Sequence, residues 1–123
     1  MRSTSSVWFK AGVVLTLLAG WCGSAPRAAA AETQSVKGEV VDMMCYLDHG
    51  AKGEKHAGCA EKCIKSGGPV GLLTEDNQLY LVIGEHKPMK KELAAYAAKT
   101  ITLKGKVVEK NGVKMIENAE IEQ

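Results

Sequence analysis

The stretch "TITLKGKVVEKNGVKMIENAEI", residues 100–121, carries the clearest fold signal in the chain. Residues 100–109 alternate apolar and polar side chains, as a strand with one buried face does. Asn111 and Gly112 follow as a hairpin turn, in which both central residues need a positive φ. Residues 113–121 read as the returning strand, so the stretch predicts an antiparallel β-hairpin.

Three further strands are predicted upstream of this hairpin. Residues 36–47 are rich in β-branched and apolar side chains, and Gly38 within them suggests a bulge or the close approach of another strand. Two shorter strands, 70–74 and 78–83, flank the turn "EDN". The domain is therefore expected to contain five strands.

Two helices are predicted between these strands. Residues 56–66 form a short helix that ends at a pair of glycines and has lysines near its C-terminal end. Pro88 is tolerated as a first helical residue, and residues 88–99 ("PMKKELAAYAAK") carry one apolar stripe at helical spacing.

The order of these elements predicts a mainly β fold. A helix between the third and fourth of five strands is the order of an OB-like Greek-key barrel, here with a Cys-bearing helix inserted after the first strand. The similar segments "VKGEVV" (36–41) and "LKGKVV" (103–108) suggest two strands that each bend at a glycine, as a small closed barrel requires. The alternative architecture is an open five-stranded α+β sheet.

Residues 1–31 read as a cleaved secretory signal peptide, which leaves 32–123 as a single domain. Basic residues precede an apolar stretch that is short for a bilayer span, and "AAAAE" (28–32) offers cleavage after Ala31. An uncleaved anchor and a lipoprotein attached at Cys22 are the alternatives. Small residues crowd the end of the segment, which disfavours the uncleaved anchor. Trp21 stands where a small residue is expected before a lipidated cysteine, which disfavours the lipoprotein. We therefore expect a periplasmic or secreted protein with no stable membrane anchor after cleavage.

The charge of the domain argues against a nucleic-acid partner. The full chain has a formal charge of +2, but the domain from Glu32 onward has thirteen lysines and fourteen acidic residues, a formal charge of −1. Non-specific nucleic-acid binding depends on clustered positive charge, and single strands stack on aromatic side chains. The domain has only three aromatic residues, namely Tyr46, Tyr80 and Tyr96. We therefore expect no nucleic-acid partner, and a protein in the periplasm is the candidate partner.

Three cysteines and two histidines lie close together in "CYLDHGAKGEKHAGCAEKC" (45–63). On the predicted helix, His56, Cys59 and Cys63 fall on one face. Cys45, expected at the end of the first strand, is the candidate that joins them. Three thiolates and one imidazole form a ligand set that suits Zn or Cu(I), with His49 as an alternative or additional ligand. Export to an oxidising compartment leaves a second interpretation open.

That second interpretation is a disulfide, which persists in oxidising compartments and would stabilise a small domain by about 2–4 kcal/mol. It would join Cys45 to Cys59 or Cys63 and leave one thiol free. The protein would then be a disulfide-stapled binding or adaptor domain without metal. The ligand spacing does not match the common C-x2-C zinc knuckles, and a redox-active cysteine pair is a third possibility.

Other candidate residues give weaker signals. Met44 or Met43 beside Cys45 could add a thioether, although packing of Met43 in the core and exposure of Met44 is the simpler expectation. His86 in "GEHKP" is expected to be an exposed loop residue. The sequence contains no complete catalytic motif, so we expect a binding protein rather than an enzyme.

The chain resembles a family of small exported bacterial proteins with an OB-like domain and no assigned function. The resemblance lies in "GEVVDMMC", in "HAGCAEKCIKSGGPVGLL" and in "LAAYAAKTITLKGKVV". In proteins of this family the segment before the last hairpin reads "YAGK", whereas this chain has Ala98 in place of the glycine. The resemblance implies the fold and export and leaves the activity open.

Overall fold

The predicted hairpin is present in the computed structural model, which describes residues 32–123. It consists of β4 (Thr100–Lys110) and β5 (Val113–Ile121). Asn111 and Gly112 connect the two strands with φ values of 53° and 81°, as a turn with two positive φ angles requires. The pairing of Lys110 with Val113 makes this a two-residue turn.

Five strands close into a barrel in the order β1-β2-β3-β5-β4. The other three strands are β1 (Thr33–Asp42), β2 (Val70–Leu73) and β3 (Leu79–Val82). Neighbouring strands are antiparallel except β3 and β5, which are parallel. The closed barrel confirms the predicted OB-like fold and excludes the open sheet.

Two glycines occur where strands of the barrel approach one another closely. A Cβ on Gly38 of β1 would lie 2.6 Å from the carbonyl oxygen of Leu73 in β2. A Cβ on Gly105 would lie 2.7 Å from Ile116, at the register shift between β4 and β5. Both glycines stand in the segments that suggested bent strands, so the absence of a side chain allows the barrel to close at these points.

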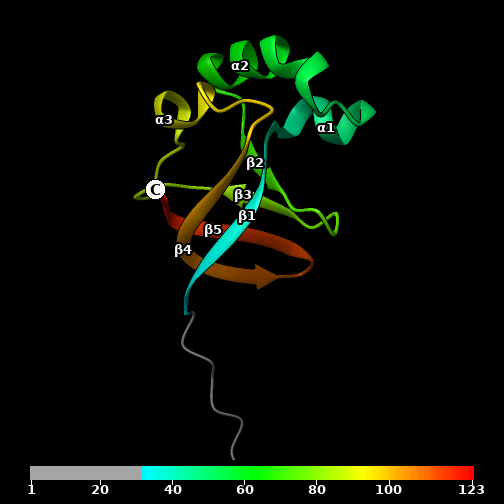
Figure 1. The fold of residues 1–123 in the computed structure, drawn as a ribbon. Helices are drawn as coiled ribbons and strands as arrows, with labels where there is room; N and C mark the ends of the chain where they lie inside the picture. Colours follow the sequence, from blue (N-terminus) through cyan, green and yellow to red (C-terminus); the bar gives the residue numbers. More distant parts are fainter. Residues whose placement is uncertain (1–31) are drawn as a thin grey trace, which may run out of the picture.

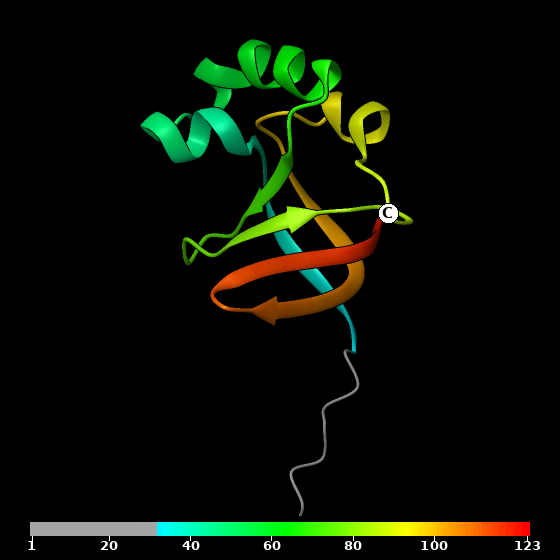
Figure 2. The same cartoon turned by 180° about the vertical axis from the view of Figure 1, so that it is seen from behind.

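The helices form a layer over one end of the barrel, opposite the end at which β1 begins (Figures 1 and 2). Between β1 and β2 the chain forms α1 (Met43–His49), the short 3-10 helix η1 (Glu54–His56) and α2 (Ala57–Ser66). The helix α3 (Lys90–Ala94) lies between β3 and β4. Ile64 of α2 and Leu93 of α3 are fully buried and share one core with barrel residues that include Val40, Leu72, Leu103 and Ile116. The helical layer is therefore packed onto the barrel by its own apolar residues.

Two predicted elements end several residues earlier in the structure than expected, while the other bounds differ by three residues or fewer. The first strand was expected to continue to residue 47, but it ends at Asp42, and Met43 begins α1. The second helix was expected over residues 88–99, but α3 ends at Ala94. After it the chain turns, Ala97 forms an isolated bridge with Val40, and Ala98 adopts a φ of 62°. Pairing with the barrel thus ends the helix earlier than its apolar stripe indicated.

The predicted signal peptide, with Cys22, lies outside the described residues. Within residues 32–123, no helix has the length and apolar character needed to cross a membrane.

Candidate metal centre

Two helices bring the three cysteines of the described chain together. Cys45 lies in the first turn of α1, and Cys59 and Cys63 lie one turn apart on α2. The three sulfur atoms are within 4.8 Å of one another. Cys45 was expected on a strand, so the sequence identified the cluster correctly but placed one member on the wrong element. All three cysteines are free thiols.

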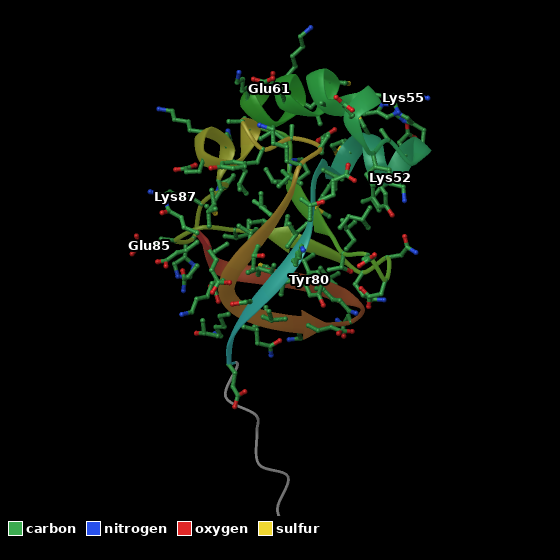
Figure 3. All side chains as sticks on the ribbon, in the orientation of Figure 1. Lys52, Lys55, Glu61, Tyr80, Glu85 and Lys87 are labelled. Atoms are coloured by element: carbon green, nitrogen blue, oxygen red, sulfur yellow. The ribbon has the colours of Figure 1, made fainter. Side chains whose placement is uncertain are left out.

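The cluster is half-buried on one side and open on the other. Cys45 and Cys63 are partly buried, whereas Cys59 is exposed. The cluster belongs to the helical layer, where the labelled Lys52 and Lys55 lie on the side of α1 and Glu61 lies over α2 (Figure 3). An ion or a reagent can therefore reach the cluster from solvent at Cys59.

Asp42 fixes the position of Cys45. Its Oδ2 accepts a hydrogen bond from the backbone N–H of Cys45 over 3.0 Å, which makes Asp42 the N-cap of α1. An Asp at this position satisfies an amide that the first helical turn leaves without a partner. The side chain is only 1% exposed, and Oδ1 is buried without a hydrogen-bond partner.

The surroundings of Cys45 and Cys63, the two partly buried or inner cysteines, favour the protonated thiol over the thiolate. A hydrogen bond to the Asp42 carboxylate, together with burial and the negative charge of Asp42, raises the pKa of Cys45 to about 12. Burial, followed by the charge of Asp42, also raises the pKa of Cys63. The thiolate is the nucleophilic form of cysteine. The raised pKa values therefore disfavour a redox role in which Cys45 or Cys63 is the attacking thiolate.

The two candidate histidines are close in sequence but are not part of the group of neighbouring ligand atoms. His56 ends η1 and precedes α2, where it is partly buried. His49 is exposed at the end of α1, with its Nδ1 3.2 Å from Asp48 Oδ2. The group found among residues 32–123 consists of the three sulfurs alone.

Met44 and the third histidine are exposed, as expected, whereas Met43 does not pack in the hydrophobic core. Met43 is partly buried against β2, where a Cβ on Gly71 would lie 2.8 Å from its Cγ. Met44 is 65% exposed. His86 is an exposed loop residue whose Nδ1 lies 3.5 Å from Glu117 of β5.

The sequence analysis missed Asp42 as a member of the site. An Asp three residues before a cysteine and directly after an apolar strand is a possible helix N-cap. The signal was hidden because "MMCYL" extends the apolar run of the strand. Once the strand is ended at Asp42, the cap and the first cysteine follow together.

The donor set can hold a soft metal ion. Zinc–sulfur bonds of about 2.3 Å place tetrahedral sulfur ligands roughly 3.8 Å apart. Sulfurs within 4.8 Å of one another need only small side-chain movements to reach that separation. A disulfide requires a bond of about 2.05 Å and a particular torsion angle, which the free thiols do not have.

No protein-family model, curated protein or solved structure matches the chain.

Proposed function

We propose that this protein binds a soft transition metal ion, Zn or Cu(I), through Cys45, Cys59 and Cys63. The observation that carries the proposal is the meeting of three free thiols from two helices within 4.8 Å. Thiolates are the preferred ligands of these ions. Caps, turns and packing in residues 42–68 hold the cysteines in place, so the cluster is formed by the fold.

The fourth ligand depends on the metal. Cu(I) is satisfied by soft sulfur donors, whereas zinc takes four ligands. His56 stays our prediction for the fourth zinc ligand, with His49 as the alternative, and either would have to move toward the sulfurs. A water molecule that enters on the side of the exposed Cys59 is the third candidate for the fourth zinc ligand.

We further propose that the protein is exported, as its N-terminal residues predict, and binds its metal in the periplasm or outside the cell. The exposure of Cys59 supports exchange of the ion with a protein partner, because an incoming ligand can reach the metal on that side. A solely structural zinc would be expected in a closed site.

Metal titration of the full chain with Cys22→Ser tests the proposal. This background leaves Cys45, Cys59 and Cys63 as the cysteines. We expect one Zn(II) or Cu(I) per chain and thiolate-to-metal charge-transfer absorption when Cd(II) replaces zinc. Changing any one of the three cysteines to Ser should weaken binding at least tenfold. Met44→Leu, which removes an exposed sulfur beside Cys45, is the matched control and should bind normally.

The disulfide alternative gives a different result in the same preparation. Protein purified without reductant would have one free thiol and a mass lower by two hydrogens, and it would bind no metal until it was reduced. That outcome would contradict the metal-binding proposal and support the disulfide-stapled adaptor domain. His56→Ala and His49→Ala, compared with His86→Ala, identify the fourth ligand, because only the true ligand should change zinc affinity.

A further inference from the structure

Asp42 is the one buried polar or charged residue found among residues 32–123, with 1% of its surface exposed. Burying a carboxylate is unfavourable unless partners offset its charge. Its Oδ2 has the Cys45 amide as a partner, but Oδ1 has none.

The carboxylate lies between the two segments that supply the cysteines. On one side it caps α1 at Cys45. On the other side, a Cβ on Gly68 would lie 2.9 Å from Oδ1 and 3.0 Å from the carbonyl oxygen of Cys63. The amide of Gly68 also donates to that carbonyl over 2.9 Å. Asp42 is therefore close to both partly buried cysteines, Cys45 and Cys63.

No cation neutralises this carboxylate within the described part of the chain. The ion pairs found there involve other acids, including Asp48, Glu61, Glu109 and Glu117. The inner cysteines, Cys45 and Cys63, thus lie close to a buried carboxylate that has no cationic partner there.

We propose that Asp42 is a specificity-determining residue, whose buried carboxylate shifts the selectivity of the metal site from monovalent toward divalent ions. The inference rests on the proposed metal-binding function and adds the class of ion. Three thiolates around Cu(I) retain two negative charges, and around Zn(II) they retain one. The repulsion from the Asp42 carboxylate is therefore larger for the Cu(I) complex.

The size of the effect follows from the difference of one charge unit between the Cu(I) and Zn(II) complexes, both of which would lie close to the Asp42 carboxylate. At an effective dielectric constant of about 20, two unit charges several ångströms apart interact strongly enough to change an equilibrium constant roughly ten- to hundredfold. The cost of deprotonating the thiols is common to both ions, so it cancels in the ratio of the two affinities.

The test compares Asp42→Asn with Glu75→Gln in the full chain carrying Cys22→Ser. Asn keeps the shape and the capping ability of Asp and removes only the charge. Glu75 is exposed in the turn between β2 and β3, so its replacement removes an equal charge at the surface without touching a candidate ligand or its partner. Affinities for Zn(II) and for Cu(I) are measured by competition with chelators. We expect the Cu(I)-to-Zn(II) affinity ratio to rise about tenfold or more in Asp42→Asn and to stay unchanged in Glu75→Gln.

The outcomes separate this inference from the proposed function. Metal bound with an unchanged affinity ratio in Asp42→Asn overturns the role of Asp42 and leaves the metal site intact. Absence of metal binding in the parent protein overturns both. If Asp42→Asn does not fold, Asp42→Ser provides a second neutral N-cap and should raise the ratio in the same direction.

Discussion

Asp42 Oδ2 accepts a hydrogen bond from the backbone N–H of Cys45 over 3.0 Å, so the last residue of β1 is also the N-cap of the helix that carries Cys45. The chain changes from strand to helix at one capping side chain. As a result, the geometry of the barrel directly sets the position of the first thiol.

Alkylation should distinguish the three thiols. Cys59 is exposed, whereas Cys45 and Cys63 are partly buried and have raised pKa values. Because the thiolate is the reactive form, iodoacetamide should modify Cys59 first in the metal-free, reduced protein. Peptide mapping by mass spectrometry after short exposures measures the order. Equal rates at all three sites would contradict the burial and pKa differences described above.

The metal-free protein should lose stability at alkaline pH. The pKa of Cys45 is raised in the folded state from 9.0 to about 12, so its contribution is fully present below about pH 9 and is lost as pH rises toward 12. Cys63 contributes in the same direction. Urea unfolding under reductant across this range should give a falling free energy of unfolding. Cys45→Ser should fall less steeply, and an identical slope would contradict the assignment.

Gly68→Ala should disturb the cluster and the fold together. The new methyl group would lie 2.9 Å from Asp42 Oδ1 and 3.0 Å from the Cys63 carbonyl oxygen, so we expect a loss of about 1–3 kcal/mol in the free energy of unfolding. Gly58→Ala is the matched control, because it lies in α2 with no atom within 4 Å of its Cβ position. That control should be neutral or stabilising by up to about 1 kcal/mol. Urea unfolding of both variants measures the contrast.

Gly38→Ala should weaken closure of the barrel. Its Cβ would lie 2.6 Å from the Leu73 carbonyl oxygen, a backbone atom that cannot move away without disturbing β2. We expect a loss of at least about 1–3 kcal/mol, measured by thermal or urea unfolding of the metal-free protein. A variant as stable as the parent would show that β1 and β2 tolerate a wider separation.

Ala98→Gly should stabilise the protein. Ala98 has a φ of 62°, a conformation that costs an L-residue roughly 1–2 kcal/mol and costs glycine little. After allowing for the greater freedom of glycine in the unfolded chain, we expect a gain of about 0.5–1 kcal/mol. Ala95→Gly, at a φ of −68°, is the control and should not stabilise. The midpoint of urea unfolding measures both.

Most of this fold was predictable from the sequence, but the chain path around Ala98 was not. The barrel was predictable because its strands alternate, Asn111-Gly112 fixes a two-residue turn, and glycines mark the bends. The early end of α3 was not predictable, since it depends on Ala97 and Ala98 pairing with Val40, a contact between residues far apart in the chain. Local patterns cannot report such a contact.

The candidate site was predictable to a similar degree. The i, i+4 spacing of Cys59 and Cys63 on a helix was readable from the sequence, and so was the partnership with Cys45. The helical position of Cys45 was obscured by the apolar residues around it, and the unpartnered state of Asp42 Oδ1 depends on three-dimensional packing. The fourth ligand depends on the metal-bound state and stays a prediction for His56 or His49.

The insertion that carries the cysteines leaves and rejoins the barrel at neighbouring points. Asp42 at the end of β1 is the register partner of Val70 at the start of β2, and the amide of Met43 donates to the carbonyl of Pro69 over 3.0 Å. Residues 43–69 therefore span two ends that a tight turn could join. Removing the segment would keep this strand pairing but would uncover the apolar core beneath Ile64, so the same insertion both carries the thiols and closes one end of the barrel.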